Sequence, residues 1–260
     1  MSAMSIAATG MQAQQLNVEV ISNNIANMNT TGYKEQQPEF EDLLYQNLRR
    51  VGATSSDANT IVPAGIQLGT GVNTGAVYRI TTQGTLQSTG NALDVAIQGQ
   101  GYFQVLMPNK QTAYTRAGSF QLSPQGQIVT QDGYTVEPGI TVPQNATAIS
   151  IDSTGQVQAS IPGQVAPQVV GQLTLATFYN DAGLQAIGNN LLLQTAASGA
   201  PVTAAPGSTG FGTIQEGFLE SSNVNPVQEI TNLITAQRAY EMNSKVITVA
   251  DQMMQDINQL

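Results

Sequence analysis

The chain has 260 residues, of which 10% are charged and 5% are aromatic, and its formal net charge at pH 7 is −9. This length can supply a sizeable core in one or two domains, while the acidic balance argues against a nucleic-acid surface and against insertion into an anionic membrane. The sequence contains no Cys and no His, so zinc sites built on those ligands, Cys nucleophiles and His-based triads are excluded.

The sequence also predicts no membrane span and no ordinary secretion signal. No stretch of eighteen consecutive residues is apolar, and the N-terminus lacks a basic region followed by a continuous apolar one. If the protein leaves the cytoplasm, we expect export without a cleaved signal peptide. The acidic group Glu39, Glu41 and Asp42 has no second carboxylate cluster to act as its general-acid partner. We therefore expect no enzymatic activity, no catalytic residue, no metal site and no cofactor.

Residues 3–28 have the periodicity of an amphipathic helix. Met4, Met11, Val18 and Ile25 fall seven residues apart, which places them on one helix face. Glu19 is the only charged residue of this segment, so its remaining surface suits contact with other protein. Asn, Thr and Gly in residues 29–32 supply the chemistry of a helix end.

The end of this helix carries a family resemblance. The sequence SNNIANMNTTGYK, residues 22–34, resembles the N-terminal signature of the flagellar rod and hook axial proteins. The residues that carry the resemblance are Ser22, Asn23, Asn24, Ala26, Asn27 and Gly32.

The segment 33–76 is predicted as a short helix over residues 36–50 followed by an extended, Gly- and Ser-rich stretch. The glycines at 69, 71 and 75 do not have the spacing of a dinucleotide-binding fingerprint. The sequences EFEDLLYQNLRRVGATSS and PAGIQLGTGV resemble a stretch typical of distal-rod members of the family rather than proximal-rod or hook members.

Residues 77–215 are predicted to form an antiparallel β-rich domain, because short apolar runs alternate there with Gly, Pro, Asn and Asp. Turns at 124–126, 132–133 and 153–155 have hairpin composition. GQGYFQV and YTRAGSFQLSPQGQIVTQDGYTV resemble the central signature shared by rod and hook proteins. The expected strands are 94–97, 101–106, 113–121, 127–131, 149–151, 156–159, 171–178 and 191–194.

Residues 225–260 are predicted to form a long amphipathic helix with Asn225 as its N-cap and Pro226 in its first turn. Val246, Met253 and Leu260 widen its apolar stripe. The stripe itself is a heptad seam, made of Leu233, Tyr240, Ile247 and Met254 with Ala236, Asn243, Ala250 and Ile257 between them. A heptad stripe can pack within its own chain or form an assembly surface.

The sequence SSNVNPVQEITNLITAQRAYEMNSKVI, residues 221–247, resembles the closing motif of the same family, and Gln237, Arg238 and Tyr240 carry that likeness. We therefore expect an α+β fold in which long N- and C-terminal helices pair as a coiled coil, with a central antiparallel β-rich domain. The expected division is 1–32, 33–76, 77–215 and 216–260.

The resemblance implies a structural subunit of a bacterial flagellar rod that polymerises into a tubular drive shaft crossing the periplasm. It implies that the eight seam residues Met4, Met11, Val18, Ile25, Leu233, Tyr240, Ile247 and Met254 pack between subunits. Its implied partners are copies of itself, proximal rod proteins, the hook protein, the surrounding ring proteins and the flagellar type III export machinery. The alternatives are a proximal-rod or hook-type subunit and a secreted, non-enzymatic binding module.

Overall fold

The computed structural model of the protein describes residues 2–49 and 64–258. The chain divides into two compact units. Unit 1 comprises Met1–Ala26, Gln36–Tyr78 and Asn225–Leu260, and unit 2 comprises Asn27–Glu35 and Arg79–Val224. Each unit is therefore built from segments that are distant in the sequence.

Unit 1 contains two long helices, α1 (Ser2–Ala26) and α2 (Pro226–Asn258). Both lie where the apolar periodicity predicted helices. The Asn225 side chain accepts hydrogen bonds from the backbone N–H groups of Val227 and Gln228, at 3.1 and 3.4 Å. Asn225 is thus the N-cap of α2 as predicted, and Pro226 occupies the first position, where a missing N–H is tolerated.

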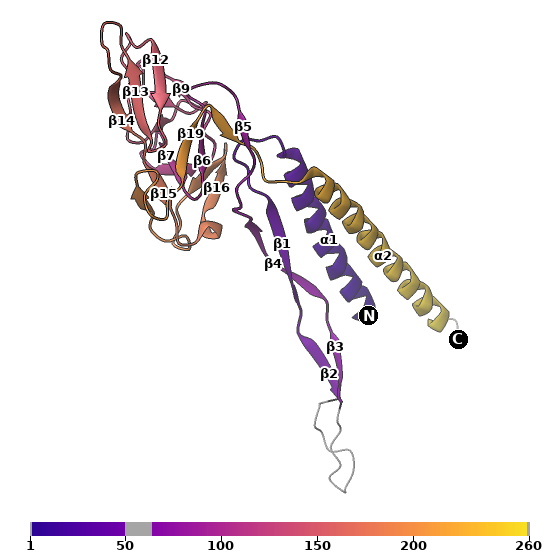
Figure 1. The fold of residues 1–260 in the computed structure, drawn as a ribbon. Helices are drawn as coiled ribbons and strands as arrows, with labels where there is room; N and C mark the ends of the chain where they lie inside the picture. Colours follow the sequence, from indigo (N-terminus) through magenta and orange to yellow (C-terminus); the bar gives the residue numbers. More distant parts are fainter. Residues whose placement is uncertain (1, 50–63, 259–260) are drawn as a thin grey trace. The chain divides into compact units, whose positions relative to one another are not determined.

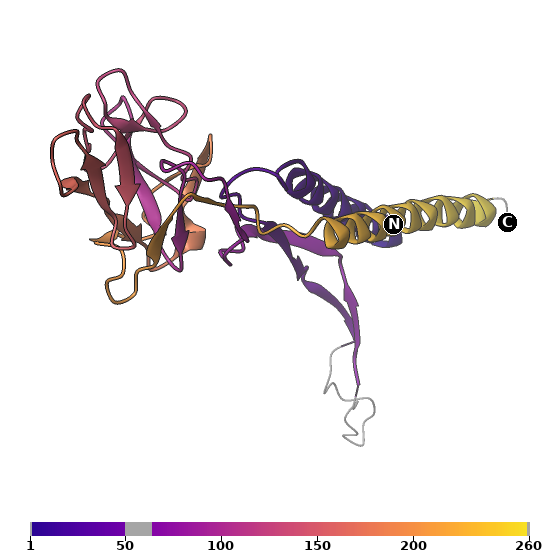
Figure 2. The same ribbon diagram turned by 45° about the horizontal axis from the view of Figure 1, so that its top comes forward.

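The prediction that these helices form a coiled coil is wrong. They lie side by side and antiparallel (Figure 1 and Figure 2), but the seam of large apolar residues does not form their contact. Tyr240 and Met254 keep 43% and 40% of their surface exposed, whereas Ala236 and Ala250 are buried. A Cβ added to Gly10 would lie 3.0 Å from the Asn243 side chain. The helices approach through small residues, whereas knobs-into-holes packing needs large side chains at the seam.

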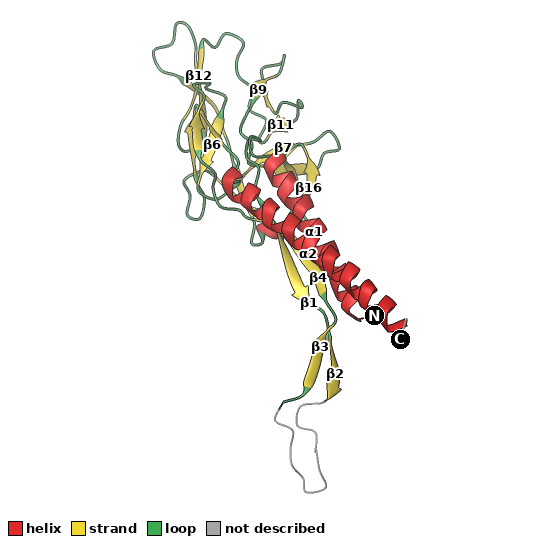
Figure 3. Cartoon of the chain, turned by 90° about the vertical axis from the view of Figure 1, so that its right-hand side faces the viewer, coloured by secondary structure: helices red, strands yellow, loops and turns green. Residues whose placement is uncertain are grey.

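The predicted short helix over 36–50 is also wrong, because strands occupy this region. β1 (Gln36–Asp42) pairs with β4 (Val72–Arg79), and β2 (Tyr45–Arg49) pairs antiparallel with β3 (Ile66–Gly69). Strands are therefore not confined to a central domain (Figure 3), which further corrects the expected fold class. Gly71 is required beside α1, since a Cβ there would lie 2.2 Å from the Thr9 hydroxyl oxygen. The predicted extended stretch falls partly outside the described residues, at positions 50–63.

Unit 2 contains the remaining strands and one 3-10 turn, η1 (Asp181–Gly183). Its largest sheet has the order β16-β17-β8-β7-β11-β10-β9, with β15 joining β7 to β18. Smaller sheets are β12-β13-β14, β19-β6 and β20-β5. The strands are β5 (Leu86–Ser88), β6 (Val95–Gln98), β7 (Tyr102–Leu106), β8 (Thr112–Thr115), β9 (Gln121–Leu122), β10 (Ile128–Val129), β11 (Thr135–Val136), β12 (Ala148–Ile151), β13 (Gln156–Ser160), β14 (Gln168–Gln172), β15 (Leu175–Thr177), β16 (Gln185–Gly188), β17 (Leu191–Leu193), β18 (Val202–Ala204), β19 (Thr213–Glu216) and β20 (Phe218–Glu220).

Every predicted strand of this region overlaps an observed one, but two were predicted too long. Residues 113–121 divide into β8 and β9, and residues 171–178 divide between β14 and β15. The three predicted turns lie in the β9–β10, β10–β11 and β12–β13 hairpins, as expected. The core of unit 2 includes Phe103 and Phe120, whose rings meet edge to face with 5.1 Å between their centroids. Apolar residues of the largest sheet, of the β12-β13-β14 sheet and of the β19-β6 sheet belong to the same core.

Candidate functional site

The first candidate site is the polar contact made by Asn24, the buried signature residue in the last turn of α1. Its amide nitrogen donates to the Gln36 carbonyl oxygen at 2.9 Å, and its amide oxygen accepts from the Gln36 N–H at 2.9 Å. The same nitrogen donates to a carboxylate oxygen of Glu229 at 3.1 Å. Asn24 and Glu229 are 1% and 3% exposed. One side chain thus joins α1, β1 and the first turn of α2 within unit 1.

The remaining N-terminal signature residues shape the turn that follows α1. The Ser22 hydroxyl donates to the Val18 carbonyl at 2.7 Å, while Asn23 and Ala26 are exposed. The Asn27 side chain accepts from the Thr30 hydroxyl at 3.1 Å. Gly32 has φ +68°, and a Cβ there would lie 2.8 Å from the backbone of Arg116 and Ala117. Glycine is required at this position both by the left-handed backbone and by the lack of space.

The signature residues of α2 lie apart from these contacts. Gln237, Arg238 and Tyr240 are exposed on the helix surface. The structure therefore does not bring the two signatures together, except where Asn24 meets Glu229.

The predicted seam residues are either half-buried or exposed. In α1, all four are half-buried, namely Met4, Met11, Val18 and Ile25. In α2, Leu233 and Ile247 are half-buried, and Tyr240 and Met254 are exposed.

A second apolar face of α2 is more open than the seam. Its members recur at spacings of four, three, four and four residues, so they follow one side of the helix. Their exposed fractions run from 47% to 69%. We call this face the outer stripe, and it consists of Met242, Val246, Val249, Met253 and Ile257. The sequence placed Val246 and Met253 at the edge of the seam and Ile257 within it. Their exposure assigns all three to the outer stripe.

Unit 2 holds a buried cluster of three charges that the sequence analysis did not identify. The Lys34 ammonium lies 2.5 Å from one Glu220 carboxylate oxygen, and the Arg116 Nε lies 2.8 Å from the other. The Gly84 N–H also donates to this carboxylate, at 3.0 Å. All three charged side chains are less than 10% exposed. Glu220, at the end of β20, therefore ties the loop after α1 to the residue that follows β8 within unit 2.

The two cations of this cluster also donate hydrogen bonds to backbone carbonyl oxygens. Lys34 donates to the Thr82 carbonyl at 2.8 Å, and Arg116 donates to the Gly101 carbonyl at 2.7 Å. Burial alone would raise the pKa of the Glu220 carboxyl, but the Arg116 and Lys34 cations lower that pKa below its usual range. Burial lowers the pKa of Lys34, although the Glu220 carboxylate opposes this effect. The Glu220 carboxylate thus contacts two cations, and each cation also donates to a backbone carbonyl, an arrangement that suits a structural tie.

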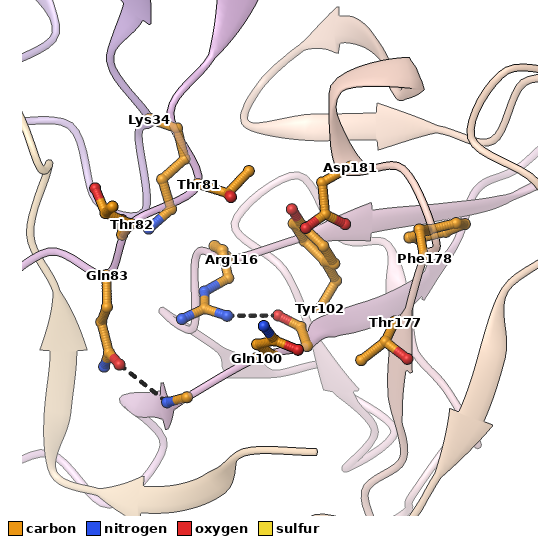
Figure 4. Close-up of a pocket in the computed structure, with 12 residues that line it drawn as sticks. Lys34, Thr81, Thr82, Gln83, Gln100, Tyr102, Arg116, Thr177, Phe178 and Asp181 are labelled. Carbon is orange, nitrogen blue, oxygen red and sulfur yellow. Dashed lines mark hydrogen bonds between the residues drawn. The ribbon is translucent and has the colours of Figure 1, made fainter. Parts of the chain in front are cut away.

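A cavity of about 370 Å³ lies beside this cluster. Figure 4 shows the Tyr102 hydroxyl close to the Asp181 carboxylate on its wall. Burial raises the pKa of both Tyr102 and Asp181. The other lining groups are mainly hydroxyls, amides and glycine backbone, from Lys34, Thr81, Thr82, Gln83, Gly99, Gln100, Gly101, Arg116, Thr177 and Phe178.

Glu220 holds both cations of the cavity lining, and the sequence has neither a His nor a Cys that could serve there as base or nucleophile. Within residues 2–49 and 64–258, no group of three or more acidic, His or Cys side chains could hold a metal ion. In the same part of the chain, no helix is both long and apolar enough to cross a membrane.

Known protein families match three parts of the chain. Residues 4–34 match the flagella basal body rod protein family, and residues 96–159 match the flagellar hook protein FlgE/F/G D1 domain. Residues 215–260 match the flagellar basal body rod FlgEFG protein C-terminal family. These matches coincide with the N-terminal, central and C-terminal motifs and confirm the resemblance seen in the sequence.

Relatives match over almost their full length. The flagellar basal-body rod protein FlgG of Caulobacter vibrioides is 62% identical, over 100% of this chain and 99% of the relative. FlgG of Agrobacterium fabrum is 55% identical, over 97% of both chains, and FlgG of Bacillus subtilis is 39% identical, over 96% of this chain and 95% of the relative. The chain therefore belongs to the FlgG family of flagellar basal-body rod proteins.

Proposed function

We propose that this chain is a structural subunit of the flagellar distal rod. Copies of it polymerise into a rigid tubular shaft that transmits motor torque across the periplasm to the hook. The family is one of structural proteins rather than enzymes.

The outer stripe of α2 is the observation that carries this proposal. Soluble monomers rarely leave a continuous apolar face open to water, and each side chain of this size gains about 1.5–3 kcal/mol when it is fully buried. A contact between this face and a different face of the next copy is heterologous, and it stays open when the rotation between copies does not close into a ring. Such a contact repeats as an open helical filament, which is the symmetry of a rod.

We further propose that the seam residues contribute to the same packing. Tyr240 and Met254 are exposed, and the other six seam residues keep part of their apolar surface open. Contact with neighbouring copies would bury the apolar surface of these residues that remains exposed in the single chain. Arg238, exposed on α2, supplies a polar edge to this surface.

The β2–β3 ribbon is a second surface for contact between copies. Leu44, which directly precedes β2, and Leu48 within β2 are 88% and 67% exposed. Ile66 and Leu68 on the paired strand β3 are about half exposed. This ribbon includes the sequence that resembles distal-rod members of the family. We propose that it packs on an adjacent subunit and makes the rod stiff.

The remaining partners follow from the family. We propose that this subunit joins proximal rod proteins at one end of the rod and the hook protein at the other, inside the surrounding ring proteins. Export proceeds through the flagellar type III machinery without a cleaved signal peptide. The site of action is the rod of the flagellar basal body, in the periplasm.

The test introduces a charge into the outer stripe. Val249→Asp places a carboxylate in an interface where an unpaired charge costs several kcal/mol, and each 1.4 kcal/mol weakens association about tenfold. The purified full chain should then fail to polymerise, as measured by sedimentation and electron microscopy. The near-ultraviolet circular dichroism of its buried tyrosines should stay unchanged.

Thr248→Asp is the matched control, because Thr248 is exposed on the same helix and lies about 100° around it from Val249 and about 80° from Tyr240. This variant should polymerise at close to the wild-type yield. Normal rods from Val249→Asp would contradict the proposed assembly surface.

A further inference from the structure

The sulfur atoms of this chain are concentrated in the terminal segments. The sequence has no Cys and eight Met. One of these, Met107, lies in the β-rich region, and the others lie in residues 1–28 and 242–254. Thioethers are therefore the only sulfur groups available for oxidation, and most of them belong to the helical regions.

Exposure separates these methionines further. Met242 and Met253 belong to the outer stripe and are 63% and 54% exposed. Met254 and Met28 are less exposed, at 40% and 36%, and Met28 lies in unit 2. Met4, Met11 and Met107 are half-buried. Susceptibility of a thioether to oxidation follows its access to solvent. The most accessible of these thioethers thus lie on the proposed assembly surface.

We propose that Met242 and Met253 are oxidation sites that control self-association of the free subunit. The oxidant is a peroxide: its O–O bond breaks, one oxygen bonds to the methionine sulfur, and the other leaves as water. Sulfur loses two electrons and the peroxide gains them. The product, methionine sulfoxide, replaces an apolar group of the outer stripe by a strongly polar one.

The chemical consequence follows from burial. A sulfoxide oxygen hydrogen-bonds to water in the free subunit and loses that partner when the stripe enters an apolar contact. Oxidised subunits therefore add poorly to a growing polymer, while subunits already assembled are shielded. Methionine sulfoxide reductases reverse the change. This inference rests on the proposed function, since it assumes that the outer stripe mediates assembly.

The experiment treats the purified full chain with hydrogen peroxide and follows oxidation by peptide mass spectrometry. Met242 and Met253 should form sulfoxide faster than Met107. The concentration of subunit needed for polymerisation should then rise about tenfold, which corresponds to ~1.4 kcal/mol for each added subunit. Incubation with a pair of methionine sulfoxide reductases should restore the original value.

Two variants make the test specific, and each is compared with its own untreated sample. The variant Met242→Leu/Met253→Leu/Met254→Leu keeps apolar side chains of similar volume, so peroxide should leave its polymerisation unchanged. Met107→Leu should remain sensitive to peroxide. The inference is overturned if oxidation of Met107 keeps pace with that of Met242, or if protein oxidised at Met242 and Met253 polymerises like untreated protein. If untreated protein does not polymerise, the proposed function fails, and this inference fails with it.

Discussion

Removing the charge of Glu220 should destabilise unit 2 more than any exposed substitution. In Glu220→Gln, the Lys34 and Arg116 cations stay buried and lose the carboxylate that both of them contact. Breaking a buried ion pair by removing one partner costs about 3–5 kcal/mol. A domain is stabilised by only about 5–15 kcal/mol in total, so the loss is a large fraction of its stability.

Urea denaturation of the full chain measures this loss. Tyr102 and Tyr114 are buried in unit 2, so the near-ultraviolet circular dichroism of tyrosine reports on its packing. With a denaturant dependence of ~2 kcal/mol per molar urea, a loss of about 4 kcal/mol lowers the midpoint by about 2 M. Glu216→Gln is the control, since Glu216 lies on the neighbouring strand β19 and belongs to neither ion pair. A shift for Glu220→Gln no larger than that of the control would refute the reasoning.

Three further changes test other parts of the structure. The pKa of Glu220 is lower in the folded protein than in the unfolded chain. Its contribution to the free energy of unfolding is therefore complete above the unfolded pKa of about 4.3 and is lost as the pH falls through the folded pKa. Acid unfolding of Glu220→Gln, followed by circular dichroism, should lack this loss. Asn24→Ala leaves the buried Glu229 carboxylate without its donor, so helix melting followed at 222 nm should show a loss of about 1–3 kcal/mol, and an unchanged melting curve would exclude this role. Leu48→Ser on the exposed ribbon should still allow polymerisation but give curved rods by electron microscopy, and straight rods would argue against ribbon packing.

The sequence could predict those features whose signals are local. The N-cap at Asn225, the long run without Gly or Pro after Pro226, and the apolar period define α2 from within a single segment. The hairpin turns of unit 2 are similarly local, because turn type depends on a few consecutive residues. The same periodicity could not show that the helix contact uses Gly10 and the alanines, because that choice depends on how closely two backbones approach.

The ribbon and the charge cluster lacked such local signals. Residues 36–49 include Leu, Glu and Gln, which favour helix, but the strand conformation comes from pairing with residues 66–79. Alternating burial along β1 appears only once that partner is in place. Lys34, Arg116 and Glu220 are separated by 82 and 104 positions, so no motif links them.

Each of the two units is built from segments that are distant in the sequence, and this limits when each unit can fold. Unit 1 needs its last segment, Asn225–Leu260, to cover the helix that begins the chain, and unit 2 needs Glu220 to hold Lys34. Neither unit can therefore complete its packing on a nascent chain until the C-terminal portion is available. Contacts between residues so distant in sequence also slow folding, because a long loop must be ordered before they form. A chain synthesised from its N-terminus would thus leave both units unfolded until almost all of it has been made.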